Sequence, residues 1–172
     1  GPAHQFTLLR PRPWPRADRR REIVQLAMDK ILHQRFAGID VDYENLTSTT
    51  RVGYTLFVQQ LAQKLHAAGK KLSVTVSAKT SDAANWSGPA GEDWVAIGAV
   101  ADSVKIMVYD EHWDGSVAGP IASLSWLDAV AAYAESSIPP QKIIIGLPWY
   151  GYDWQGTSAA TVTYADAVSR AQ

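Results

Sequence analysis

The stretch that decides the fold is Phe36-Ala37-Gly38-Ile39-Asp40-Val41-Asp42-Tyr43-Glu44. Apolar and acidic residues alternate along it, as in a β-strand, because successive side chains of a strand point to opposite faces. The strand predicted over residues 37–44 therefore carries three carboxylates on one face: Asp40, Asp42 and Glu44. Since like charges this close resist ionising together, we expect a raised pKa for at least one of them. Such a group can donate a proton near neutral pH.

Two other interpretations of this acidic row stay open from the residues alone. One is a solvent-exposed edge strand, where charged side chains discourage pairing with another chain. The other is a divalent-metal site, because carboxylate oxygens suit Mg²⁺ or Ca²⁺. No further ligand spacing accompanies the row, so we expect neither a metal nor a cofactor.

The rest of the chain alternates between helical and strand-like patterns. Helices are predicted over residues 17–34, 51–68, 93–101 and 125–136, strands over 71–76, 104–109 and 143–148, and a further helix is expected to begin within 164–171. Strands that alternate with helices indicate βαβ crossovers and a parallel sheet. Residues 1–16 are predicted to form an irregular segment, because Pro11, Pro13 and Pro15 block a helix there. Residues 17–172 are expected to form one domain.

Local signals refine two of these helices. The apolar side chains of the 51–68 helix follow helical spacing, and Gly69 is expected to end it. Ser125 is predicted to cap the 125–136 helix. The residues of the 51–68 stripe are Tyr54, Phe57, Val58, Leu61 and Leu65.

Polar and aromatic residues gather just after the predicted strands. They are Glu44, Lys79, the pair Tyr109-Asp110 and the pair Trp149-Tyr150. Because (β/α)₈ barrels place their active sites at the carboxyl ends of the strands, this position indicates an active site. No glycine-rich phosphate loop follows any strand, so a nucleotide-binding fold is not supported.

Composition excludes several classes of function. The chain has 172 residues, 47% of them hydrophobic, and a formal net charge of -1. It has no cysteine, which excludes thiol catalysis and disulfides. Six arginines lie between Arg10 and Arg21, but no nucleic-acid-binding motif accompanies them, so no nucleic-acid partner is expected. There is no apolar run of about 18 residues and no signal peptide in the opening GPAHQFTLLR, so no membrane span is expected.

Three motifs, in order, resemble those of glycoside hydrolase family 18, the chitinase-type (β/α)₈ barrels. Asp40, Asp42 and Glu44 are similar to the last three acidic positions of D-x-x-D-x-D-x-E, while Ala37 stands where the first Asp would be. Residues 107–110 are similar to M-x-Y-[DN], and residues 146–151 to G-x-P-x-Y-G. The loop over residues 109–124 most resembles the branch of spore-cortex-lytic N-acetylglucosaminidases and related peptidoglycan hydrolases.

The resemblance implies a partial TIM barrel, with about strands 4–7 and their helices. Strands 1 and 2, most or all of strand 3, and strand 8 with its usual substrate-stacking Trp have no counterpart. We therefore expect a fragment whose open strand edges favour self-association. The residues from Tyr164 onward resemble the start of the small α+β insertion that precedes strand 8.

The resemblance also implies a chemistry. Glu44 would be the general acid and then the base, Asp42 would share its proton, Asp40 would set the charge of Asp42, and Tyr109 would donate a hydrogen bond to the substrate. Met107, Asp110, Trp149 and Tyr150 would contact the sugar.

The substrate would be a polysaccharide with 2-acetamido sugars, peptidoglycan or chitin-like, cleaved with retention of configuration by substrate-assisted catalysis. The alternative is a catalytically silent, lectin-like glycan-binding relative, which the Ala37 departure and the absent strands favour. We expect an extracellular, cell-wall or spore-associated protein whose isolated fragment is inactive.

Overall fold

The computed structural model describes residues 17–34, 36–82 and 87–171. Its helices and strands follow the predicted alternation. They are α1 (Ala17–His33), β1 (Gly38–Asp42), α2 (Arg51–Ala67), β2 (Lys71–Ser77), α3 (Trp94–Val100), β3 (Ser103–Met107), α4 (Leu124–Ser137), β4 (Ile143–Gly146), β5 (Gly151–Gln155), β6 (Ser158–Val162) and α5 (Tyr164–Arg170). The irregular segment predicted over residues 1–16 lies outside the described residues.

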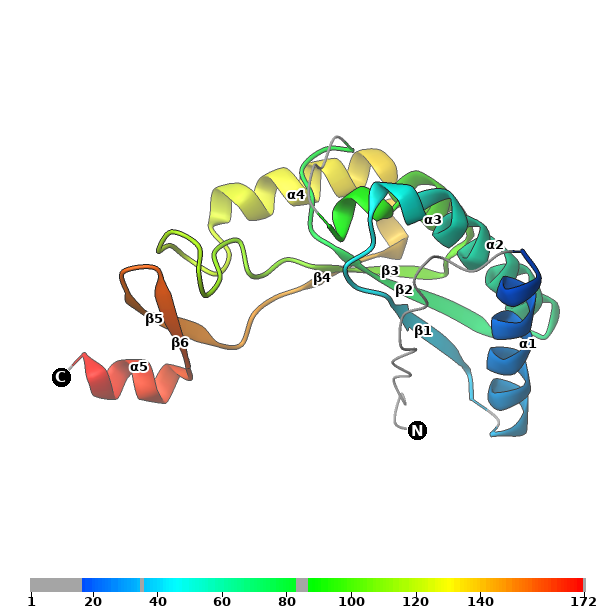
Figure 1. Ribbon diagram of the computed structural model, residues 1–172, viewed down its shortest axis with the longest axis horizontal. Coiled ribbons are helices and arrows are strands. Elements are labelled where there is room, and N and C mark those ends of the chain that lie inside the picture. The colour runs from blue at the N-terminus through cyan, green and yellow to red at the C-terminus, as the bar shows by residue number, and fades with distance from the viewer. Residues whose placement is uncertain (1–16, 35, 83–86, 172) are drawn as a thin grey trace.

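Four parallel strands form the main sheet in the order β1-β2-β3-β4. Figure 1 shows α2, α3 and α4 together on one face of this sheet, with α1 beside α2, while none of the described helices covers the other face. Sequential parallel strands joined by helices on one side form the repeating unit of a (β/α)₈ barrel. The predicted fold class, a partial barrel of this type, is confirmed in this arrangement.

The core lies between the sheet and its helices. The predicted stripe of α2 is buried throughout, and Gly69 ends the helix with a φ of 66°, as predicted. Alternate residues of the strands, among them Val41, Val74 and Ile106, point into this core. The residues between them, which include Asp40, Thr75 and Lys105, therefore point to the uncovered face.

Three strands end earlier than predicted. β1 stops at Asp42, β3 at Met107 and β4 at Gly146. Pairing ends because the backbone turns away: Asn45 and Asp110 adopt φ values of 55° and 58° soon after β1 and β3. Asn and Asp are among the residue types that best tolerate this left-handed conformation. Glu44 and Tyr109 consequently lie in loops beyond the strands, rather than within them as predicted.

The predicted cap of α4 was wrong by two residues. Ser123, not Ser125, is the N-cap, and its hydroxyl accepts a hydrogen bond from the Trp126 amide at 3.2 Å. Glu111 selects this serine, because its carboxylate accepts from the Ser123 amide at 2.6 Å and from the Ser123 hydroxyl at 3.0 Å. This contact joins the loop after β3 to the start of α4.

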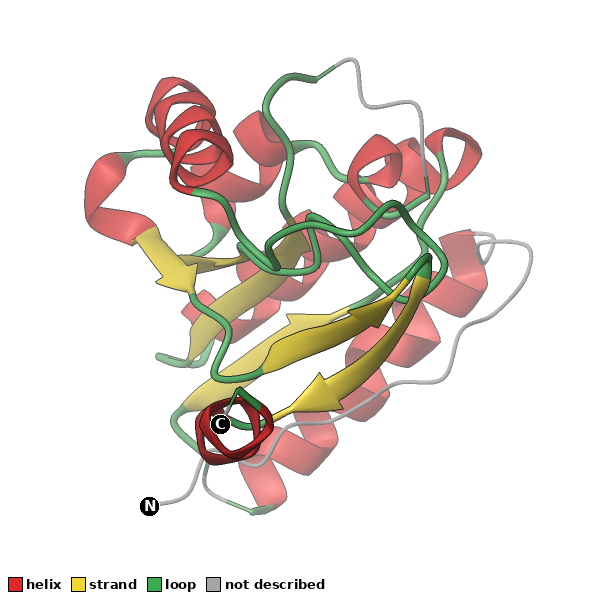
Figure 2. Ribbon diagram, turned by 90° about the vertical axis from the view of Figure 1, so that its left-hand side faces the viewer, coloured by secondary structure: helices red, strands yellow, loops and turns green. Residues whose placement is uncertain are grey.

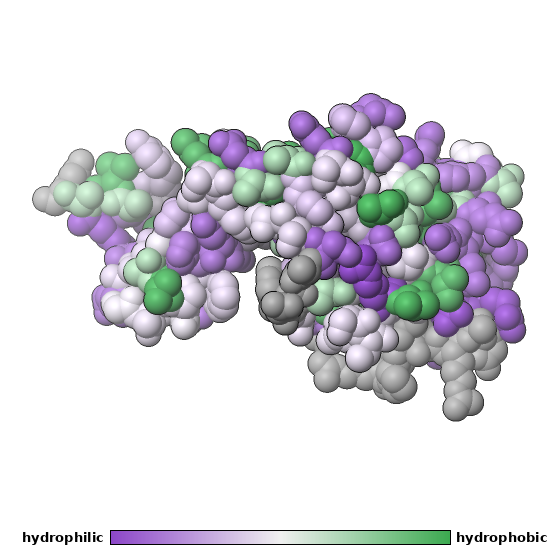
Figure 3. Space-filling model, turned by 90° about the horizontal axis from the view of Figure 1, so that it is seen from above, coloured by the Kyte–Doolittle hydropathy of each residue, from purple (hydrophilic) through white to green (hydrophobic). Residues whose placement is uncertain are grey.

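A second, two-stranded sheet was not predicted. β5 and β6 pair antiparallel, with Gln155 opposite Ser158, so Gly156 and Thr157 form a two-residue turn. Gly156 has a φ of 65°, as such hairpin turns require. The hairpin and α5 lie in front in Figure 2, and they project at the left end of Figure 3, away from the main sheet.

Candidate active site

Glu44 lies where the chain leaves β1. Tyr43 and Leu46 on either side of it are buried, and Asn45 has the left-handed conformation described above. This tight turn leaves the Glu44 side chain exposed at the carboxyl end of the sheet. Tyr43 is held by edge-on contacts with Tyr54 and Phe57, whose ring centroids lie 5.9 and 5.8 Å away. The turn thus exposes the Glu44 carboxylate to solvent, while the residues on either side of it are packed in the core.

Asp40 and Asp42 point from β1 to the uncovered face of the sheet. Oδ2 of Asp40 accepts a hydrogen bond from the Thr75 hydroxyl at 3.0 Å, and Oδ1 lies 3.1 Å from the ammonium of Lys105. Asp42 is directly opposite Thr75 in the β1–β2 register, one step nearer to the carboxyl end. The structure therefore orders the three acids from the interior outward as Asp40, Asp42 and Glu44.

Tyr109 is close to the outer end of this row. It follows β3 and is partly buried. Burial raises its pKa, and the charges of Asp42, Glu44 and Asp110 raise it further. Since Coulomb interactions fall with distance, this effect requires the phenol to be near these carboxylates. Met107, two residues earlier, is the last paired residue of β3. It lies on the same side of the chain as Tyr109.

Asp110 connects Tyr109 to the residues after β4. Its Oδ1 accepts hydrogen bonds from the hydroxyls of Tyr150 at 2.6 Å and Tyr152 at 3.1 Å. Burial, followed by the hydrogen bond to Asp110, raises the pKa of Tyr150. The structure thus brings together Asp110 and Tyr150 among the predicted sugar-contacting residues. Trp149 is different, because 97% of its surface is exposed.

The β5–β6 hairpin packs against the loop that follows β3. The indole N–H of Trp154 donates to the Gly119 carbonyl at 3.1 Å, and the Ala159 amide donates to Asp114 at 2.8 Å. The Tyr152 ring contacts the rings of Tyr150 and Trp154 edge to face, with centroid distances of 5.8 and 5.6 Å. Sequence reasoning singled out Trp149 and Tyr150 but missed this wall beside the site. The alternation of Tyr152 and Trp154 before Gly156 was the available signal.

Several other polar residues near the strand ends have structural roles. His112 pairs with the Pro120 carbonyl at 2.9 Å, within its own loop. Lys79 is buried and donates to the Glu92 carbonyl at 2.7 Å and to Asp82 at 3.0 Å, and its ammonium lies over the Trp94 ring. These contacts hold the loop after β2 against the helices.

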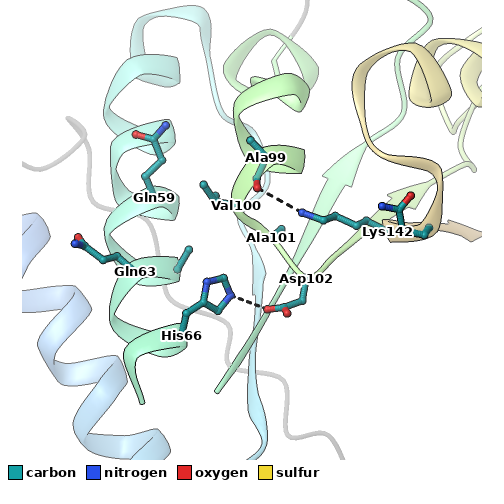
Figure 4. A pocket seen from close by; sticks show the side chains of 10 residues that line it. Gln59, Gln63, His66, Ala99, Val100, Ala101, Asp102 and Lys142 are labelled. Atoms are coloured by element: carbon teal, nitrogen blue, oxygen red, sulfur yellow. Dashed lines mark hydrogen bonds and ion pairs between the residues drawn. The ribbon is translucent and has the colours of Figure 1, made fainter. Parts of the chain in front are cut away.

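A surface pocket lies at the other end of the sheet. It measures about 500 Å³ and is lined by side chains of α2 and of the segment that leads into β3, as Figure 4 shows. There His66 pairs with Asp102 at 2.8 Å. Burial alone would raise the pKa of Asp102. Hydrogen bonds from Lys71, the Leu72 amide and His66 outweigh burial and hold this pKa below its usual range. This pocket is at the amino ends of the strands, where barrel residues serve stability rather than catalysis.

Neither a metal centre nor a membrane helix is found in the described part of the chain. Over residues 17–34, 36–82 and 87–171, no group of three or more His, Cys, Asp or Glu side chains could hold a metal ion. The metal interpretation of the acidic row therefore gains no support. None of the described helices is long and apolar enough to cross a bilayer.

The parallel sheet, its one-sided helices and the polar row at its carboxyl edge define part of a (β/α)₈-barrel domain. Within that class, the chain belongs to the glycosyl hydrolases family 18, whose sequence profile matches residues 13–172. The resemblance drawn from the three motifs is thereby confirmed.

The relatives share both sequence and fold with the chain. The sporulation-specific glycosylase YdhD of Bacillus subtilis (strain 168) is 36% identical over 157 residues, which are 88% of this chain and 37% of that protein. The YdhD crystal structure matches with a TM-score of 0.85 and 34% identity, over 91% of this chain and 53% of the other.

Two further relatives differ in their named activities. The cortical fragment-lytic enzyme of Bacillus anthracis is 36% identical over 119 residues, covering 68% of this chain and 27% of the enzyme. A chitinase from Chromobacterium violaceum ATCC 12472 has a TM-score of 0.84 at 33% identity, covering 90% of this chain and 49% of that one. The chain thus spans between about a quarter and a half of the length of these relatives.

Proposed function

We propose that the protein is a retaining glycoside hydrolase that cleaves β-linked glycans containing N-acetylglucosamine by substrate-assisted catalysis. The observation that carries this proposal is the closeness of Tyr109 to Asp42 and Glu44 at the carboxyl ends of β3 and β1. A proton donor on an exposed turn and a phenol beside it can act on one sugar together, the donor at the glycosidic oxygen and the phenol at the neighbouring 2-acetamido group. Family 18 is a recognised exception to hydrolysis by two carboxylates.

In the proposed first step, Glu44 protonates the glycosidic oxygen while the bond from that oxygen to the anomeric carbon breaks. The carbonyl oxygen of the substrate's own 2-acetamido group attacks the anomeric carbon and forms a cyclic intermediate. In the second step, the Glu44 carboxylate removes a proton from water, and the water oxygen attacks the anomeric carbon while the bond from that carbon to the acetamido oxygen breaks. Because the anomeric carbon is attacked twice, its configuration is retained.

The neighbouring residues would support these steps. Tyr109 would donate a hydrogen bond to the acetamido oxygen, and Asp42 would orient the acetamido N–H and share a proton with Glu44. Asp40, one position further inside, would set the charge of Asp42. Asp110 is held by Tyr150 and Tyr152 and would line the same subsite.

Two more residues would contact the sugar ring. Met107 would provide an apolar surface at the end of β3. The exposed indole of Trp149 would stack on the ring, as amphipathic aromatics commonly do on such surfaces.

Peptidoglycan is the substrate we propose first. Among the relatives described above, a cortical fragment-lytic enzyme and a sporulation-specific glycosylase each match at 36% identity, and both names point to the bacterial spore. Chitin is the competing substrate, because a chitinase matches nearly as well in structure. A peptidoglycan substrate would place the protein at the cell wall or spore, outside the cytoplasm.

We propose that the 172-residue chain alone is inactive and self-associates. It covers 53% of the YdhD chain in that crystal structure, so a substantial part of the matching barrel has no counterpart here. In the described residues, β1 and β4 each have a sheet partner on one side only. Unpaired strand edges favour pairing with another chain.

The second candidate function is glycan binding without cleavage. Ala37 replaces the first acid of the family motif, which favours this alternative. Glu44 favours hydrolysis, because a silent relative has no need of the proton donor.

The test is release of reducing ends by the full-length protein from purified peptidoglycan and, separately, from chitin. We expect release from peptidoglycan, and we expect the first product formed from a defined oligosaccharide to be the β-anomer by ¹H NMR. Binding to both glycans without any release would overturn the hydrolase proposal in favour of the lectin-like one. Release from chitin alone would overturn the choice of peptidoglycan.

A further inference from the structure

Lys105 occupies the middle of the uncovered sheet face. It is paired with Thr75 of β2 and with Ile144 of β4, and its side chain reaches across β2 to Asp40 of β1. Its ammonium lies 3.1 Å from Oδ1 of Asp40, and 43% of the side chain remains exposed. In the sheet register Lys105 is therefore level with Thr75 and Asp42, inside the strand ends beyond which Glu44 and Tyr109 lie.

The two oxygens of Asp40 have unequal surroundings. Oδ2 accepts the Thr75 hydrogen bond, whereas Oδ1 is buried and accepts no hydrogen bond from the described residues. The contact between the Lys105 ammonium and Oδ1 is thus an ion pair without good hydrogen-bond geometry. The positive charge of the ammonium compensates the negative charge of Oδ1. A buried carboxylate oxygen without such compensation is unfavourable. The Asp40 side chain is only 17% exposed, so solvent screens this pair incompletely.

The neighbours of Asp40 in the described part of the chain differ in charge. Asp42 lies on the same face of β1, with Glu44 beyond it, and both are acidic. From β2, Thr75 is neutral, and from α2 comes the phenol of Tyr54, whose pKa is raised first by burial and then by neighbouring charges that include Glu92, Asp42 and Asp40. Among the described residues, Lys105 on β3 is therefore the cation that pairs with Asp40.

We propose that Lys105 is a positioning residue of the active site, whose ammonium holds the Asp40 carboxylate at the inner end of the acidic row so that the shared proton stays between Asp42 and Glu44. This inference rests on the proposed function for its catalytic meaning. A cation at the inner end of a row of three acids makes ionisation favourable there first. The proton is then held at the outer end, where Glu44 would deliver it to the glycosidic oxygen.

The ion pair can be tested on the 172-residue chain without any substrate. Asp40 is followed by ¹³C NMR of its carboxyl carbon as the pH is varied, in the unmodified chain and in Lys105→Met, Lys105→Arg and Lys64→Met. We expect the Asp40 midpoint to rise in Lys105→Met, because the cation that favours the charged carboxylate is removed. Arg should restore the unmodified midpoint, and Lys64→Met, an exposed position on α2, should leave it unchanged. Matching ¹H–¹⁵N spectra would show that the variants fold.

An Asp40 midpoint that is the same in Lys105→Met and in the unmodified chain would overturn the inference, whatever the activity. In the full-length protein, Lys105→Met should move the acidic limb of the kcat/KM profile, and Lys105→Arg should return it. An acidic limb that is the same in Lys105→Met and in the unmodified protein would overturn the claim that Lys105 positions the acids for catalysis. A protein that shows the NMR shift but never releases reducing ends would refute the hydrolase proposal and leave the ion pair standing.

Discussion

The buried carboxyl group of Glu92 makes the stability of this fold depend on pH. Its side chain is 1% exposed and lies between β2 and α3, beside the indole of Trp94. Burial raises its pKa from 4.5 to about 7, although hydrogen bonds donated by the Ser77 amide at 3.0 Å and the Ser77 hydroxyl at 3.1 Å oppose the rise. The unfolded chain has no such burial, so its Glu92 titrates at the ordinary value.

The sign of the effect follows from proton binding. Between pH 4.5 and about 7, the folded chain keeps a proton on Glu92 that the unfolded chain has released. The free energy of unfolding contributed by Glu92 is therefore full below pH 4.5 and is lost as the pH rises through about 7. A pKa difference of about 2.5 corresponds to about 3 kcal/mol.

Glu92→Gln should remove this dependence, because an amide does not ionise. We expect urea unfolding, followed by tryptophan fluorescence at one protein concentration, to show the variant gaining about 3 kcal/mol relative to the unmodified chain between pH 4.5 and 8. Glu135→Gln, which removes an exposed carboxylate of α4, is the matched control. Parallel stability curves for Glu92→Gln and the unmodified chain would refute the reasoning, whatever the constant offset between them.

Two further predictions concern association and catalysis. The open edges at β1 and β4 predict that the 172-residue chain elutes as a dimer or larger species in size-exclusion chromatography with light scattering, and a stable monomer would contradict this. Tyr109→Phe removes one proposed donor to the acetamido oxygen and should lower kcat of the full-length protein by about 10²–10³-fold. An unchanged kcat would remove Tyr109 from the proposed mechanism.

The order of elements could be predicted from the sequence because it depends on local periodicity. The apolar stripe of α2 and the alternation of β1 each signal their own structure, and Gly69 signals the end of a helix. The ends of the strands could not be predicted in the same way. The alternation through Tyr43 and Glu44 continues after pairing has stopped, because the left-handed turn at Asn45 takes the chain away from β2.

Contacts between distant segments set the remaining features. Ser123 and Ser125 are equivalent as candidate caps until Glu111 from another loop binds one of them. Lys105 looks like any polar residue of an alternating strand, and its partner Asp40 lies two strands away. The motifs therefore pointed to the acids and to Tyr109, but the cation beside them required the assembled sheet.

The central claim is that Glu44 carries the proton for glycan hydrolysis. Its most direct test is Glu44→Gln in the full-length protein, which keeps the size and polarity of the exposed side chain while removing its acidity. We predict that reducing-end release from peptidoglycan falls by about 10²–10⁴-fold while glycan binding is retained, with Glu135→Gln as the control. Release at the unmodified rate by Glu44→Gln would contradict the account.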